Sequence, residues 1–195
     1  MESLMRGYQR FMERYWSENR DVFQALAAKG QAPRAMVIAC CDSRVSPEVI
    51  FDTEPGEIFV VRNVANLVPP YAPDSDNHGT SAALEFAVRK LRVSHIIVMG
   101  HSLCGGIRAL VEDNLTDDDD FIGPWMKIAT VARERSLAAA DGVVETARQL
   151  CEHESIRVSL ANLLTFPWIK ERVEQDDLQL HGWFFNIDTG TLDQI

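Results

Sequence analysis

The sequence predicts an α/β domain in which a mostly parallel central β-sheet is flanked by helices, with a helical arm at the N-terminus. Two short apolar runs, AMVIAC at 35–40 and HIIVMG at 95–100, are typical of strands buried on both faces. Between them, residues 80–91 repeat apolar side chains at helical spacing. Strands that alternate with helices favour parallel pairing, and 195 residues without an evident linker predict one domain, residues 1–195.

The first 30 residues precede this pattern and predict two helices. Apolar and aromatic side chains recur there every three or four positions, namely Leu4, Tyr8, Phe11, Met12, Tyr15 and Trp16. A second, shorter apolar face follows at residues 22–27, and Lys29-Gly30 is typical of a helix end. Because an aromatic stripe needs an apolar partner, we expect residues 1–30 to form an arm that packs on a second subunit.

The remaining elements follow in chain order. Ser46-Pro47-Glu48 is typical of a helix start with proline at the first helical position, and EIFVV at 57–61 predicts a second strand. Further helices are predicted at 121–132, 143–164 and 167–175, and a last strand at 178–187. The acidic run 117–120 predicts a solvated loop.

Composition and charge disfavour several classes of function. A net charge of −10 and a pI near 4.9 oppose binding to nucleic acid or to an anionic membrane surface. No segment is apolar over the length that crosses a bilayer, and the N-terminus lacks the apolar core of a signal peptide, so we expect a cytoplasmic protein. Four cysteines are too few for a disulfide scaffold of this length and are interpreted as thiols or metal ligands.

Two polar clusters follow the two apolar runs. Cys40 ends the first run, with Asp42 and Arg44 just beyond it, and His101 and Cys104 follow the second. Because the carboxyl ends of parallel strands form one edge of a sheet, we expect the clusters to converge. Two thiolates and one imidazole are a ligand set typical of Zn2+, with a fourth position left open in catalytic sites. The alternative is a closed structural site in which Asp42 is the fourth ligand.

These motifs resemble those of the β-class carbonic anhydrases, in their plant-like branch. The pattern C-x-D-x-R is present at 40–44 and H-x-x-C at 101–104, and the stretches EPGE at 54–57, VVRNVANL at 60–67 and NLLT at 162–165 also match. The resemblance covers roughly residues 25–190. It implies zinc on Cys40, His101 and Cys104, with Asp42 or water as the fourth ligand and with Arg44 pairing Asp42 when water is bound. The implied activity is reversible hydration of CO2 to bicarbonate, in a homodimer or homotetramer.

The same resemblance implies a substrate pocket. Gln31 is the amide expected to bind an oxygen of CO2 or bicarbonate, and Gly105 leaves a backbone amide near the anion. Apolar walls are expected from Phe59, Val64 and Phe86. Relatives with a regulatory bicarbonate site carry Trp three residues before the first metal ligand, where this chain has Val37. We therefore expect no such regulatory site.

Two other functions are compatible with these motifs. The same zinc site could hydrolyse carbonyl sulfide or carbon disulfide, because both present a linear carbon to the same nucleophile. The chain could also be a non-catalytic, zinc-stabilised dimer or a thiol redox protein. That interpretation leaves Asp42 and Arg44 without a role.

Overall fold

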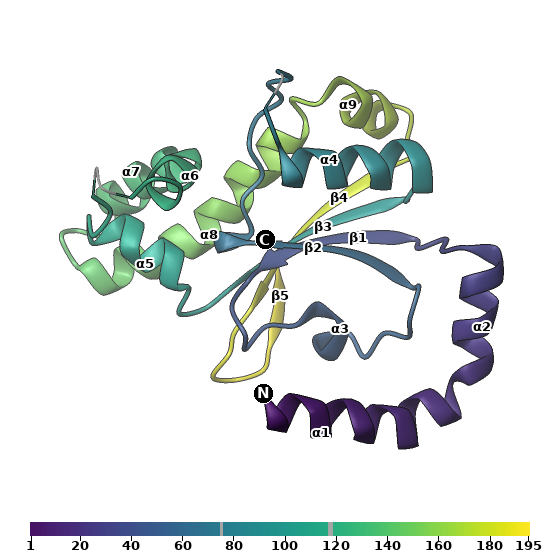
Figure 1. Cartoon of the computed structure of the whole chain (residues 1–195). Coiled ribbons are helices and arrows are strands. Elements are labelled where there is room, and N and C mark those ends of the chain that lie inside the picture. Colours follow the sequence, from purple (N-terminus) through teal and green to yellow (C-terminus); the bar gives the residue numbers. More distant parts are fainter. Residues whose placement is uncertain (75, 117–118) are drawn as a thin grey trace.

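A five-stranded sheet forms the centre of the computed structural model, which describes residues 1–74, 76–116 and 119–195 (Figure 1). Its strands are β1 (Ala35–Cys40), β2 (Ile58–Asn63), β3 (His95–His101), β4 (Gln179–Phe185) and β5 (Leu192–Gln194), in the order β2-β1-β3-β4-β5. The first four strands pair in parallel, and β5 pairs antiparallel with β4. The predicted mostly parallel sheet is confirmed.

Alternating residues of the central strands bury two different faces. Met36 and Ile38 point to the face covered by α4 (Gly79–Glu85), α8 (Val144–Leu163) and α9 (Pro167–Glu174). Val37 and Ala39 point to the other face, over which α3 (Pro47–Ile50) and Phe51 pack. The strands β1 and β3 are therefore buried on both faces, which is why apolar residues dominate their sequences.

Three helices lie beyond the carboxyl ends of the strands (Figure 1). They are α5 (Gly105–Val111), α6 (Ile122–Met126) and α7 (Thr130–Ala139). These helices and the loops after β1 and β3 surround the edge of the sheet at which the predicted ligands lie. None of the helices in the described part of the chain combines the length and apolarity that a bilayer crossing requires.

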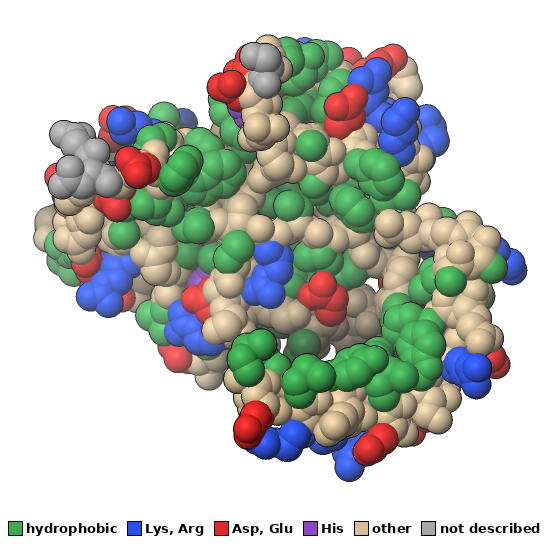
Figure 2. Space-filling model, viewed as in Figure 1, with side chains coloured by type: hydrophobic (Ala, Val, Ile, Leu, Met, Phe, Trp, Pro, Cys, Tyr) green, Lys and Arg blue, Asp and Glu red, His purple; other side chains and the backbone are tan. Residues whose placement is uncertain are grey.

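The N-terminal arm stands away from the sheet. It comprises α1 (Glu2–Phe11), a π-helical segment (Met12–Trp16) and α2 (Arg20–Lys29), and none of their residues is buried. Trp16 and Phe23 pack at the bend with ring centroids 4.7 Å apart, and the Tyr15 hydroxyl donates a 3.0 Å hydrogen bond to Glu54. A hollow separates α1 from the body, and hydrophobic side chains line the arm along it (Figure 2). The predicted helical arm is confirmed.

Several boundaries differ from the prediction. The helix expected at 80–91 changes to π-helical geometry over Phe86–Leu91, and the helix expected at 121–132 is divided by a 3-10 turn at Lys127–Ala129. The strand β5 was not predicted, because three exposed residues are too few for a periodic pattern. Of the acidic run 117–120, residues 117–118 lie outside the described residues.

Candidate metal centre

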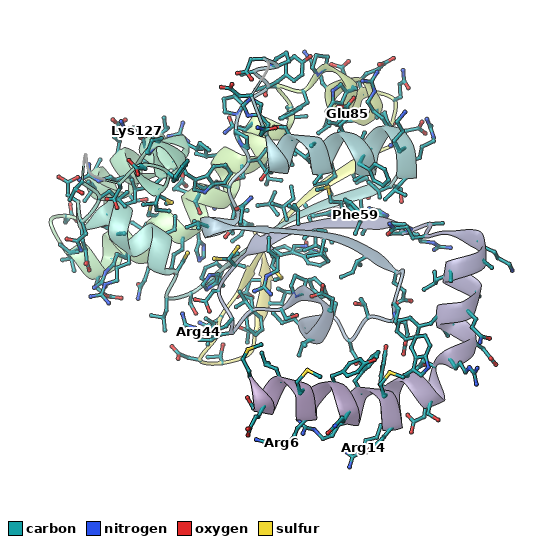
Figure 3. The ribbon with its side chains drawn as sticks, in the orientation of Figure 1. Arg6, Arg14, Arg44, Phe59, Glu85 and Lys127 are labelled. Carbon is teal, nitrogen blue, oxygen red and sulfur yellow. The ribbon has the colours of Figure 1, made fainter. Side chains whose placement is uncertain are left out.

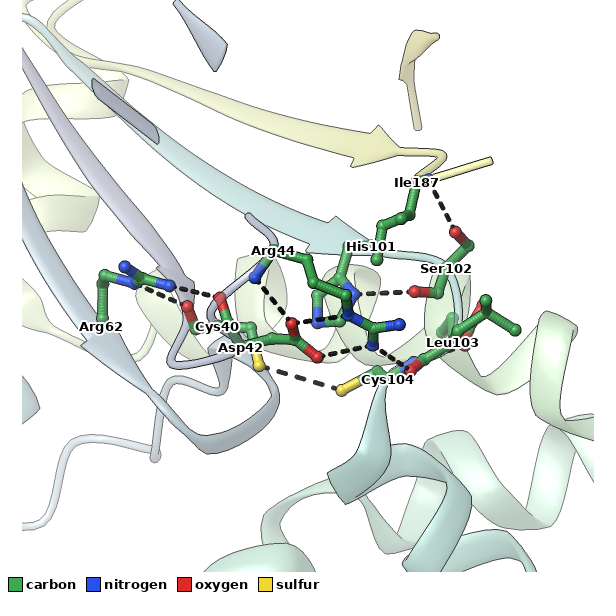
Figure 4. Close-up of polar contacts among 10 residues, drawn as sticks. Cys40, Asp42, Arg44, Arg62, His101, Ser102, Leu103, Cys104 and Ile187 are labelled. Carbon is green, nitrogen blue, oxygen red and sulfur yellow. Dashed lines mark hydrogen bonds and ion pairs between the residues drawn. The ribbon is translucent and has the colours of Figure 1, made fainter. Parts of the chain in front are cut away.

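Three potential ligands converge at the carboxyl edge of the sheet. β1 and β3 are adjacent and parallel, so Cys40 and His101, their last residues, lie at the same edge. Cys104 immediately precedes α5. The three side chains are buried, their ligand atoms all lie within 4.8 Å of one another, and the two sulfurs are 4.0 Å apart (Figure 4). The structure thus brings together residues that are 64 positions apart in the sequence.

The imidazole of His101 directs its free nitrogen into this cluster. Nδ1 lies 2.8 Å from the Ser102 carbonyl oxygen, and we assign Nδ1 as the donor because a carbonyl can only accept. The lone pair is then on Nε2, which is buried and has no hydrogen-bond partner among the described residues. Unpartnered buried nitrogens are rare, and a metal ion between His101 and the two sulfurs would satisfy this one.

The protonation of the two thiols also fits a cation. The hydrogen bond from Cys104 holds the pKa of the Cys40 thiol well below its usual range, whereas the same contact and burial raise the pKa of Cys104. Two thiolates 4.0 Å apart repel each other strongly in a buried site, and a divalent ion permits both to ionise. Burial lowers the pKa of His101, but Cys40, the Ser102 carbonyl and Asp42 together raise it by more.

A carboxylate and a guanidinium flank the three ligands. Arg44 donates to both oxygens of Asp42, from Nε at 2.9 Å and from a terminal nitrogen at 2.7 Å, and its backbone N–H adds a 3.0 Å bond (Figure 4). These bonds hold the pKa of Asp42 well below its usual range. Arg44 also donates to the Leu103 carbonyl at 3.1 Å, which links the two ligand loops. Asp42 is not part of the cluster within 4.8 Å.

Two further side chains hold the ligand loops and were not predicted. Arg62 on β2 donates to the Cys40 carbonyl at 2.8 Å and also to the Asp42 carbonyl. Glu152 on α8 accepts a 3.0 Å hydrogen bond from the backbone N–H of Cys104. The sequence does contain a signal for Arg62, because it is a single arginine inside the mostly apolar strand β2. The signal for Glu152 is weaker, because it is only a glutamate on the buried side of a helix.

Val64 and Gly105, two of the predicted pocket residues, lie at the same edge as the ligands. Gly105 begins α5 directly after Cys104, and nothing lies within 4 Å of the position that a Cβ would take there. Val64 follows β2, and its carbonyl accepts a 2.8 Å hydrogen bond from the indole of Trp125. A Cβ on Gly106 would lie 2.8 Å from Val64, so glycine permits α5 to approach.

Gln31, Phe59 and Phe86, the other predicted pocket residues, lie elsewhere in the chain. Phe59 precedes Asn63, the last residue of β2, by four positions, which is roughly 13 Å along a strand. Phe86 stacks on Phe59 with ring centroids 5.8 Å apart, and Gln31 is exposed in the loop before β1. Phe59 and the labelled Arg44 lie well apart in Figure 3. The chain does not place these three residues beside its own ligands.

Known proteins resemble this chain in sequence. The family model described as carbonic anhydrase matches residues 35–192. Beta carbonic anhydrase 3 of Arabidopsis thaliana is 39% identical over 198 residues, which cover 99% of this chain and 76% of that protein. Beta carbonic anhydrase 5, chloroplastic, from the same plant is 47% identical over 161 residues, 82% of this chain. The matched region is only 53% of that relative's length.

Solved structures agree at the level of the fold. The β-carbonic anhydrase CcaA superposes with a TM-score of 0.93 at 36% identity, covering 100% of this chain and 91% of that one. One of two tetrameric β-carbonic anhydrases from Sordaria macrospora gives 0.85 at 28% identity, covering 100% and 95%. The family model matches most of the chain, and a relative that is 39% identical covers 99% of it, so this chain belongs to the β-carbonic anhydrase family.

Proposed function

We propose that the protein hydrates CO2 reversibly to bicarbonate and a proton, at a zinc ion held by Cys40, His101 and Cys104. The observation that carries this proposal is the convergence of two buried sulfurs and an unpartnered imidazole nitrogen within 4.8 Å. Two sulfurs and one nitrogen suit tetrahedral zinc and leave a fourth position for the reaction. A zinc ion, when bound, supplies the Lewis acidity that makes water a nucleophile at neutral pH.

In this proposal Asp42 orients the nucleophile and Arg44 orients Asp42. A carboxylate has about four lone-pair sites. Arg44 occupies three of them, so one remains to accept a hydrogen bond from the attacking water. The low pKa of Asp42 keeps it ionised for this task. Direct ligation of zinc by Asp42 would close the site, and Arg44 binds Asp42 outside the ligand cluster, so in this proposal the paired arrangement is the active one.

The predicted substrate pocket is then shared between two subunits. Val64 and Gly105 lie beside the ligands, whereas Gln31, Phe59 and Phe86 are remote from them in the same chain. We propose that the remote group lines the site of a partner subunit. The 46% exposure of Phe86 leaves an aromatic ring free to take part in such a contact. Val37 is buried in the sheet, and the proposal includes no regulatory bicarbonate site at that position.

A second copy of the chain is the proposed occupant of the hollow beside the arm. Leu4, Met5 and Tyr8 on α1 are each more than half exposed. The arm is already fixed by its aromatic bend and by the bond between Tyr15 and Glu54, so its apolar side needs no rearrangement to bind. Related proteins from Sordaria macrospora are described as tetrameric, which supports self-association. One relative is named chloroplastic, and a cytoplasmic location stays a prediction.

Tyr8→Glu is expected to raise the dissociation constant of the dimer at least ~10-fold, because it places a charge in a desolvated apolar contact. Sedimentation velocity over a concentration series measures this constant. Gln9→Glu adds the same charge one position further along α1 and is the matched control, for which little change is expected. A wild-type protein that sediments as a monomer at all concentrations would contradict the proposed dimer.

The alternative substrates are tested by comparing turnover of CO2 and carbonyl sulfide by the same zinc-loaded sample. We expect CO2 hydration to be faster by several orders of magnitude. Faster turnover of carbonyl sulfide would favour the hydrolase, and zinc binding without either activity would favour a structural dimer. A structural dimer would leave the Asp42–Arg44 pair without a function, and no residue of the site favours carbonyl sulfide over CO2.

A further inference from the structure

Glu152 is a buried carboxylate for which the proposed mechanism has no use. It lies on α8 with 6% of its surface exposed, and among the described residues no Lys or Arg lies within ion-pair distance of it. A buried acid without a cationic partner destabilises a fold, so its position beside a ligand loop calls for a function.

The group that Glu152 binds belongs to a metal ligand. Its Oε1 accepts a 3.0 Å hydrogen bond from the backbone N–H of Cys104. The preceding residue, Leu103, has a φ of +60°, a left-handed conformation that is unfavourable for a residue with a Cβ. The turn between His101 and Cys104 is therefore strained, and strain of this kind persists only where surrounding contacts fix it.

Three of the contacts that hold this turn come from different sides. Arg44 donates to the Leu103 carbonyl at 3.1 Å, from the side of Asp42. The Ser102 hydroxyl accepts from the backbone N–H of Ile187 at 2.9 Å, which ties the turn to the end of β4. Glu152 holds the Cys104 end from the side of α8. Of the three, only Glu152 acts on the backbone of the residue that carries a sulfur ligand.

We propose that Glu152 is a positioning residue of the metal centre, whose carboxylate holds the Cys104 backbone and thereby aims the Cys104 sulfur at the ion. This inference rests on the proposed metal site and adds a residue to it. Side chains that orient metal ligands from outside the coordination shell contribute 10–100-fold to metal affinity in other proteins.

The simpler interpretation is that Glu152 only stabilises the start of α5. Metal affinity distinguishes the two, because a residue that merely supports the fold would change the melting temperature and leave the affinity of the folded protein unchanged. Two substitutions of similar length separate the acceptor from the volume. Glu152→Gln keeps an oxygen that can accept the Cys104 N–H, and Glu152→Met fills the space without an acceptor.

The experiment measures Zn2+ affinity by competition with a chromophoric chelator, and the thiolate absorption bands of the Co2+-substituted protein. We expect Glu152→Met to bind Zn2+ ~10–100-fold more weakly with shifted Co2+ bands, and Glu152→Gln to stay within ~3-fold of wild type. Gln149→Met, one turn earlier on the same helix, is the matched control and should equal wild type. If Glu152→Met does not fold, Glu152→Asp, which shortens the carboxylate by one methylene, takes its place with the same expected loss.

Unchanged Zn2+ affinity and Co2+ bands in folded Glu152→Met would overturn the inference. Equal losses in the Gln and Met variants would overturn it too, because glutamine keeps the acceptor. A wild-type protein that binds no metal would instead contradict the proposed function. The failure of one proposal is therefore distinguishable from the failure of the other.

Discussion

Cys40→Ala is expected to lower zinc affinity by at least about 100-fold and to reduce CO2 hydration to the uncatalysed background. Structural zinc sites with four protein ligands bind with about 10–16 kcal/mol, so one ligand contributes about 3 kcal/mol, which is a factor of more than 100. The loss is large because Cys40 is buried and lies 4.0 Å from the other sulfur, and the ligand cluster among the described residues contains only His101 and Cys104 besides it. Metal analysis after gel filtration and stopped-flow hydration measure the two effects.

The matched control for this prediction is the next residue. Cys41 is exposed and does not belong to the ligand cluster, so Cys41→Ala should keep one zinc ion per chain and wild-type activity. Both variants remove one thiol, but Cys40 is the buried last residue of β1, whereas Cys41 follows the strand and is exposed. One zinc ion per chain and full activity in Cys40→Ala would mean that the ion lies elsewhere.

Asp42→Ala is expected to keep the zinc ion and to lower kcat for CO2 hydration by about 10²–10⁴-fold, the usual contribution of a positioned group that accepts a proton or a hydrogen bond in the reaction. The substitution leaves Cys40, His101 and Cys104 in place, and the Arg44 side chain it frees is 46% exposed and can be solvated. Stopped-flow kinetics on samples of measured zinc content separate loss of metal from loss of turnover.

A second carboxylate near Arg44 controls for the change in charge. Asp188 is exposed and its charge also acts on Arg44, yet it makes no hydrogen bond to that guanidinium among the described residues. Asp188→Ala should therefore keep kcat near the wild-type value. If Asp42→Ala retained full turnover, the assigned role of Asp42 would be wrong, and if it lost zinc, Asp42 would be a ligand.

The sequence predicts the metal cluster well because its ligands follow strongly patterned strands. The run before Cys40 is apolar throughout, and the run before His101 is apolar after its first residue, His95, since both strands are buried on two faces. Parallel pairing then places the two strand ends at one edge without any knowledge of the intervening 60 residues. The helix boundaries are less predictable, because π-helical and 3-10 geometry at 86–91 and 127–129 depends on packing rather than on local pattern.

The residues that hold the loops could not be inferred in the same way. Arg62 and Glu152 act through backbone atoms of other segments, and no spacing in the sequence encodes such long-range contacts. The division of the predicted pocket has a similar cause. Gln31 precedes β1, and Phe59 is near the start of β2, which pairs in parallel with β1. Both therefore lie at the amino ends of these strands, opposite the edge that carries the ligands.

X-ray absorption at the zinc edge of the purified wild-type protein tests the central claim most directly. The account predicts one ion per chain whose first shell contains two sulfurs at about 2.3 Å and nitrogen or oxygen at about 2.0–2.1 Å, one of them from imidazole. A first shell without sulfur would contradict it, because Cys40 and Cys104 would then not bind the ion. Four sulfurs would contradict it as well, since His101 would be excluded and no position would be open to substrate.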